Sequence, residues 1–121
     1  MMITLLHGLP DNVLGARVTG KVTDADYEQV LVPAVREKLD KHKKIRFIYV
    51  IDNDFDGWSL GAMWEDAKLG LKNPTAYEKI AIVSDKDWVE HTVKALGWMI
   101  PGDVKDFDLD DLDDARKWAS S

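Results

Sequence analysis

One run of β-branched and aromatic residues, Ile45–Ile51, constrains the fold of this chain more than any other stretch. The run reads Ile-Arg-Phe-Ile-Tyr-Val-Ile, which is typical of a strand buried on both faces. Such strands occur mainly in parallel sheets that are covered by helices. The run therefore predicts the central strand of an α/β sheet. The turn after it leaves the carboxyl end of that strand, where open α/β sheets usually bind ligands.

The rest of the chain alternates between strand and helix patterns. Short apolar runs predict further strands at Met2–Leu6, Val13–Val18, Lys79–Val83 and, as a charged edge strand, Val104–Phe107. Apolar residues at helical spacing predict helices from Thr23 to about His42, from Ser59 to Leu71, from Ser84 to Leu96 and from Asp108 to Ala119. The order β-β-α-β-α-β-α-β-α predicts a small α/β sandwich with a mixed, mostly parallel sheet.

Three local signals sharpen these boundaries. The turn formers of Gly8–Asn12 predict an antiparallel hairpin between the first two strands. Thr23 and Asp26 resemble a capping box, with Asp in place of the usual Glu, and Pro33 predicts a kink within the first helix. Ser84–Asp87 resembles a second capping box, and Gly97 stands where the residue after a helix C-terminus is expected.

Composition narrows the class of protein and its partners. With 121 residues and 45% apolar content, the chain is expected to form one domain over residues 1–121. A net charge of -6 argues against a nucleic-acid partner, because a phosphate backbone requires a basic surface. The absence of Cys, of a secretory signal and of an apolar run long enough for a membrane span predicts a cytoplasmic protein that is not an integral membrane protein.

The acidic turn Asp52–Gly57 allows three interpretations. It matches the first half of a calcium loop, but Met63 occupies the position that should supply a bidentate Glu. Asp52 and Asp54 also look like the opening motif of haloacid-dehalogenase-like phosphohydrolases, which would make them nucleophile and acid/base with magnesium as cofactor. That family requires further motifs for which this chain lacks room. A solvated turn is favoured, so no catalytic residue, metal or cofactor is predicted.

Apolar residues near the strand ends give the predicted ligand site. They follow the central strand and the third helix, and they are Trp58, Leu60, Met63, Trp64, Trp98, Met99 and Ile100. Each cluster taken alone is more typical of core packing. Gly97 and Gly102 bracket Trp98–Ile100, which predicts either a movable lip over the site or residues packed beneath the edge strand.

The run Asp54–Asp66, together with Asp85–Trp88 and the turn Ile100–Gly102, resembles the SpoIIAA-like family of small bacterial proteins. The resemblance covers essentially the whole chain. It implies a STAS-like fold related to anti-sigma-factor antagonists, with similarity to the lipid-carrying CRAL-TRIO fold, and a role in binding an apolar or lipid-like ligand. It implies no enzyme activity.

Anti-sigma-factor antagonists carry a phosphorylatable Ser just before the helix that follows the central strand. Here Ser59 is the candidate phosphosite, in a shifted register, and it is also a plausible N-cap of that helix. We therefore expect a non-catalytic binding module for an apolar or lipid-like small molecule. The alternative is a regulatory module that docks a protein partner or a second copy of itself, and a metal-dependent phosphohydrolase is the third.

Overall fold

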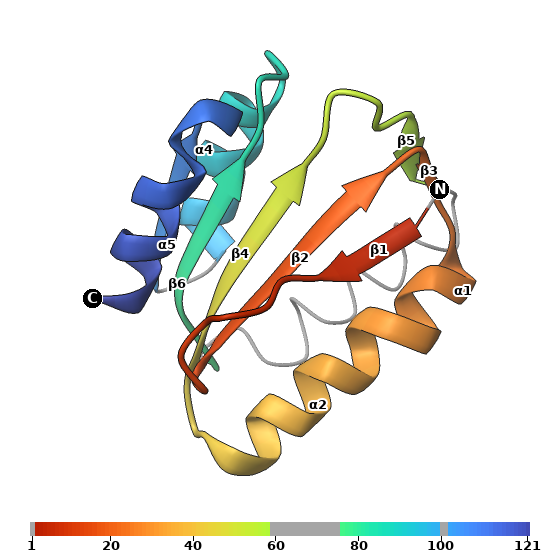
Figure 1. The fold of residues 1–121 in the computed structure, drawn as a ribbon. Helices are drawn as coiled ribbons and strands as arrows, with labels where there is room; N and C mark the ends of the chain where they lie inside the picture. Colours follow the sequence, from red (N-terminus) through yellow and green to blue (C-terminus); the bar gives the residue numbers. More distant parts are fainter. Residues whose placement is uncertain (1, 59–75, 100–101) are drawn as a thin grey trace.

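A five-stranded sheet forms the centre of the computed structural model, which describes residues 2–58, 76–99 and 102–121 (Figure 1). The strands lie in the order β1-β2-β4-β6-β7, with bounds β1 Met2–Leu5, β2 Val13–Thr19, β4 Ile45–Ile51, β6 Tyr77–Val83 and β7 Asp103–Phe107. β1 runs antiparallel to β2, and every other neighbouring pair is parallel. The mixed, mostly parallel sheet predicted from the sequence is confirmed, with the predicted central strand in the middle position.

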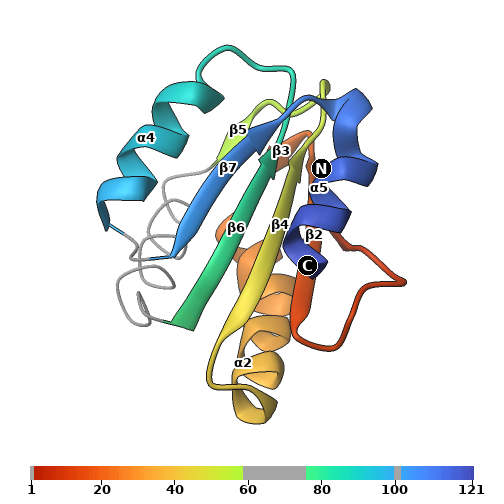
Figure 2. The same ribbon diagram turned by 90° about the vertical axis from the view of Figure 1, so that its left-hand side faces the viewer.

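The side chains of β4 alternate between two apolar cores. Phe47 and Ile51 belong to the core beneath the first helical segment and α4 (Val89–Met99), and Ile48 and Val50 belong to the core beneath α5 (Leu112–Ser120). Figure 2 shows α4 and α5 on opposite sides of the sheet. A strand with apolar neighbours on both faces explains why the run Ile45–Ile51 has no polar alternation.

The first helical segment begins at the capping box that the sequence predicts. The backbone N–H of Thr23 donates to Asp26 Oδ2 over 2.8 Å, and the N–H of Asp26 donates to Thr23 Oγ1 over 3.3 Å. The segment continues through α1 (Asp24–Asp26), a π-helical turn (Tyr27–Leu31) and α2 (Val32–Lys41). The two reciprocal bonds satisfy backbone donors that would otherwise lack partners.

The disruption expected at Pro33 takes the form of the π-helical turn. Proline lacks an N–H, so the carbonyl of Gln29 cannot receive the usual bond from four residues ahead. The backbone instead widens, and Val32 N–H donates to the carbonyl of Tyr27, five residues back. Pro33 then stands in the first turn of α2, where an N–H is not needed.

The third predicted helix has different ends in the structure. It begins at Val89. In the loop before it, the Ser84 hydroxyl accepts a bond from Lys86 N–H, and the Asp85 carboxylate accepts one from Leu109 N–H. These side chains fasten the loop and do not cap the helix. The helix then runs through Gly97 to Met99, so Gly97 does not follow its end.

Two further short strands are present that the sequence pattern does not predict. β3 (Lys21–Val22) and β5 (Gly57–Trp58) pair in parallel as a separate two-stranded sheet. Each has two residues, which is too short to show any periodicity. Gly57 has a φ of 114°, a conformation that favours glycine. The helix predicted from Ser59 to Leu71 lies outside the described residues.

Candidate functional site

The structure describes part of the apolar site that the sequence predicts at the strand ends. Trp58 ends β5, and Trp98 and Met99 end α4. Trp98 is 93% exposed. The other members of this prediction lie outside the described ranges: Leu60, Met63, Trp64 and Ile100, together with the candidate phosphosite Ser59. The site therefore stays a prediction.

Gly97, one of the two hinges proposed for the movable lip, lies within a helix. Gly97 and Trp98 are helical, whereas the hypothesis placed Trp98 in a turn between two flexible glycines. Gly102 is the other hinge, and its Cα lies against the backbone of Tyr77 and Glu78 at the start of β6. The close approach of two strands requires this glycine, so its role there is packing.

The acidic turn after β4 is organised by its own backbone. Asp52 N–H donates to the carbonyl of Val18, and the Asp52 carboxylate accepts from Asn53 N–H over 2.8 Å. The same carboxylate lies 3.5 Å from Arg17 Nε, while Asp54 is exposed. Within the described ranges, no three His, Cys, Asp or Glu side chains are grouped to hold a metal ion. This geometry is that of a fastened turn.

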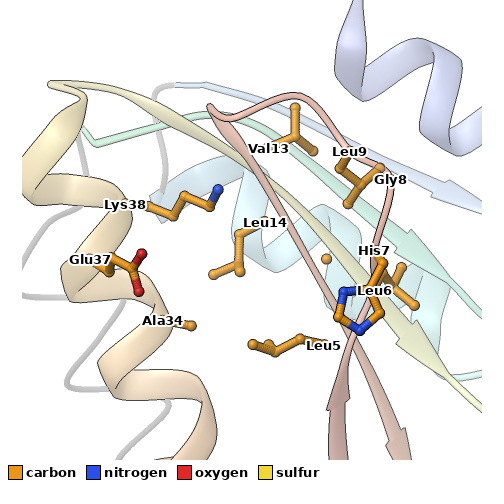
Figure 3. Close-up of a pocket in the computed structure, with 11 residues that line it drawn as sticks. Leu5, Leu6, His7, Gly8, Leu9, Val13, Leu14, Ala34, Glu37 and Lys38 are labelled. Carbon is orange, nitrogen blue, oxygen red and sulfur yellow. The ribbon is translucent and has the colours of Figure 1, made fainter.

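A cavity of about 310 Å³ lies at the end of the sheet away from the acidic turn, between the β1–β2 connection and α2 (Figure 3). The side chains on one side come from α2, and those on the other come from the connection and from β2. The lining residues are Leu5, Leu6, His7, Gly8, Leu9, Val13, Leu14, Gly15, Ala34, Glu37 and Lys38. This end of the sheet holds the amino ends of β2 and β4.

Both apolar cores contribute to the cavity wall. Leu5 and Leu14 pack in the core beneath α2, whereas Leu6 and Leu9 pack in the core beneath α5. Gly15 in β2 makes this arrangement fit, because a Cβ at that position would lie 2.8 Å from a methyl group of each of the latter two leucines. The connection thus rests directly on the strand, and its leucines wall the cavity on one side.

Asp11 fastens the connection to the end of α2. Lys38 Nζ donates to the carbonyl of Asp11 over 2.7 Å, and His42 Nε2 lies 2.8 Å from Asp11 Oδ2. The ionised carboxylate can only accept, so the imidazole N–H donates. That bond holds the pKa of the Asp11 carboxyl below its ordinary value; desolvation opposes the shift, and the charges of Lys38 and Lys41 add to it.

A second attachment lies on the far side of the connection. Arg116 Nη1 in α5 donates to the carbonyl of His7 over 3.2 Å. The connection is therefore bonded to a helix on each side of the sheet. The titratable side chains at the cavity are His7, Glu37 and Lys38. Such a site can hold a small molecule by apolar contact and orient it with a few polar groups.

No local sequence pattern predicts this cavity. The turn formers of Gly8–Asn12 predict only the connection of an antiparallel hairpin. One signal was available: Leu5, Leu6 and Leu9 surround a turn and exceed what a two-stranded hairpin can bury. The pairing of Asp11 with His42 joins residues far apart in sequence, and no local pattern indicates it.

The fold defines a small α/β sandwich of the STAS type, in which a mixed sheet carries helices on both faces. The family model described as SpoIIAA-like matches residues 13–120. This chain belongs to the SpoIIAA-like family, as the resemblance of its motifs predicted.

A solved structure agrees with this assignment. The chain is similar to an uncharacterized protein of the DUF3478 family with a SpoIIAA-like fold from Shewanella loihica PV-4. The two are 30% identical with a TM-score of 0.74, over 98% of this chain and 93% of the other. No protein of curated function matches the sequence. None of the described helices has the length and apolar character to cross a membrane.

Proposed function

We propose that this protein is a non-catalytic binding module for a small apolar molecule. The observation that carries the proposal is the half-open cavity between the β1–β2 connection and α2, whose lining is about equally polar and apolar. Its volume of about 310 Å³ lies at the lower end of the range for small-molecule sites. Leucine side chains from both cores form its apolar part, and polar groups that include His7, Glu37 and Lys38 form the rest.

The size of the cavity bears on the class of ligand. A water molecule occupies about 30 Å³, so the space corresponds to roughly ten waters. A single short acyl chain or one aromatic ring system fits that space, whereas a phospholipid with two long chains does not. Within the broad class of apolar or lipid-like ligands, the cavity favours the small members.

Binding of a neutral apolar fluorophore tests the proposal. 1-Aminonaphthalene, a neutral fluorophore with one fused ring system, should shift its emission to shorter wavelength with the wild-type chain. The variant Ala34→Phe, which fills the cavity from α2, should abolish that shift. The matched control is Ala95→Phe on the exposed surface of α4, which should leave it intact.

Native mass spectrometry of protein purified from cells provides an independent arm. A small apolar molecule retained by the wild-type chain and lost from the Ala34→Phe variant supports the proposal. No retained molecule, together with no fluorophore binding, would refute it. Fluorophore binding that Ala95→Phe abolishes and Ala34→Phe spares would move the site to the end of α4, near the residues predicted from the sequence.

Trp98 favours a second candidate function, the docking of a protein partner. It is 93% exposed at the end of α4, and Trp is enriched among the residues that dominate binding energy at interfaces. A second copy of the chain is the simplest partner to test. Sedimentation equilibrium should then show self-association that Trp98→Ser weakens at least tenfold. A monomer at high concentration would remove self-docking from this candidate.

A further inference from the structure

We infer that the cavity recognises a small amphipathic carboxylate, with its apolar part against Leu5, Leu14 and Ala34 and its carboxylate at Lys38 Nζ. The inference rests on the proposed function, because it names the chemical class of the ligand for the same cavity. It depends on the placement of one ammonium group beside leucine and alanine side chains. Figure 3 shows Lys38 reaching from α2 toward the side of the cavity formed by Leu14 and Val13.

The Lys38 ammonium group has more N–H donors than the hydrogen bonds that it makes within the described residues. Its side chain is 23% exposed, and Nζ donates one bond, over 2.7 Å, to the carbonyl of Asp11. The Asp11 carboxylate oxygen Oδ1 is 3.6 Å away, which is an ion pair and too long for a hydrogen bond. An ammonium group has three N–H donors. Its other donors therefore lack a hydrogen-bonded acceptor among the described residues, in a partly desolvated position where an anionic acceptor is favoured.

The two carboxylates near the cavity each have a basic partner other than Lys38. The Asp11 carboxylate oxygen Oδ2 is bonded to His42 over 2.8 Å. Glu37 is the one lining carboxylate and would repel an anion, but its side chain is 73% exposed and lies 3.7 Å from Lys41 Nζ. Solvent and Lys41 therefore screen the charge of Glu37, and they do so more strongly than solvent screens the charge of the less exposed Lys38. Lys38 is thus less exposed than either carboxylate, and its ammonium group is the charge that a ligand in the cavity would meet.

Volume and charge together define the probe. A ligand of about ten non-hydrogen atoms matches the space of roughly ten waters. Octanoate has that size, with an apolar chain and one carboxylate. Its neutral counterpart, 1-octanol, presents the same chain without the charge. The difference between the two isolates the contribution of the carboxylate.

Calorimetric titration of the full chain with both probes tests the inference. Octanoate should bind the wild-type chain about tenfold or more tightly than 1-octanol, as expected for a charge-assisted hydrogen bond in a desolvated site. Lys38→Met should remove this preference, so that octanoate binds no more tightly than 1-octanol. Lys41→Met, one turn further along the same helix, should retain the preference. Glu37→Gln should raise octanoate affinity by a small factor.

The outcomes separate the two proposals. Equal binding of octanoate and octanol to the wild-type chain, or a preference that survives Lys38→Met, would overturn the carboxylate inference and leave the binding module standing. No binding of either probe would overturn both. If Lys38→Met loses both probes because the connection loosens, Lys38→Arg decides: a retained preference supports the inference and a lost one overturns it.

Discussion

Gly97 and Gly102 differ in the space that surrounds them: a side chain would fit at the first and would clash at the second. An added Cβ at Gly102 would meet the carbonyl oxygens of Tyr77 and Glu78, the second at 2.7 Å. Both atoms are backbone, so neither can turn aside as a side chain would. An added Cβ at Gly97 would meet nothing within 4 Å, and the residue is helical. The same substitution should therefore change stability in opposite directions at the two sites.

Gly102→Ala should lower the free energy of unfolding by about 1–3 kcal/mol, because the start of β7 must move away from β6. Gly97→Ala should raise it by about 0.5–1 kcal/mol, because alanine loses less backbone entropy in a helix. Urea denaturation of both variants beside the wild type measures the pair. A destabilised Gly97→Ala variant would contradict the helical assignment at that position.

Asp11 makes the attachment of the β1–β2 connection dependent on pH. Its pKa is lowered in the folded protein, chiefly by the bond from His42. A lowered carboxyl pKa stabilises the fold above the unfolded value of roughly 3.9, and this contribution is lost as the pH falls through the folded value. The stability difference between wild type and Asp11→Asn should therefore be present at pH 6 and vanish in strong acid.

Urea titrations at a series of pH values measure this difference directly. Asp40→Asn in α2 serves as the control, because it changes the net charge by the same amount. A difference between wild type and Asp11→Asn that stayed constant down to pH 2.5 would show that the carboxylate does not fasten the connection.

At the scale of the element, the capping box ties the start of α1 to two side chains that depend on each other. Thr23→Ala should cost about 1 kcal/mol of unfolding free energy, because Asp26 N–H loses its acceptor. The double variant Thr23→Ala, Asp26→Ala should cost less than the sum of the two single variants, since each bond completes the other. Asp24→Ala, in the same turn, should cost only a few tenths of a kcal/mol.

Thermal or chemical denaturation of the four chains gives the coupling energy. Strict additivity of the two single variants would show that the reciprocal bonds act independently. Far-ultraviolet circular dichroism should confirm that helix content changes little, because apolar contacts of Tyr27 and Leu31 anchor the segment beyond the cap.

The elements differ in how far the sequence predicts them. Strong local patterns gave the central strand, the capping box and the last helix, whose buried Ala115 and Ala119 recur at helical spacing. The start of α4 was predicted too early, because Asp85 bonds to Leu109 across the fold and is not a cap. The attachment of the β1–β2 connection to α2 includes the bond between Asp11 and His42, a contact that only the folded chain creates.

For the whole molecule, the position of β4 predicts the order in which the sheet opens. It has parallel neighbours on both sides and apolar cores on both faces, and Ile45, Ile48 and Val50 are fully buried. The edge strands β1 and β7 each have one neighbour within the described sheet. Local openings of the edges therefore expose fewer contacts than an opening at the centre.

Amide hydrogen exchange should be slowest in β4 and should approach the rate set by global unfolding. Amides of β7 should exchange faster, because its burial pattern contains no fully buried residue. The experiment follows individual amides by NMR under native conditions. Protection in β7 equal to that in β4 would mean that the sheet opens only as a single unit.

The π-helical turn lets α2 keep its rotational phase although the segment holds one residue more than a regular α-helix needs. Its bond spans five residues where an α-helical bond spans four, so removing one residue from Tyr27–Leu31 would let the turn close as regular α-helix. Ala34 and Lys38 would then stay on the cavity wall that they now share. A one-residue deletion in the π-helical turn should thus preserve the preference for octanoate, whereas a deletion between this turn and Ala34 would rotate the rest of α2 by about 100° and abolish it.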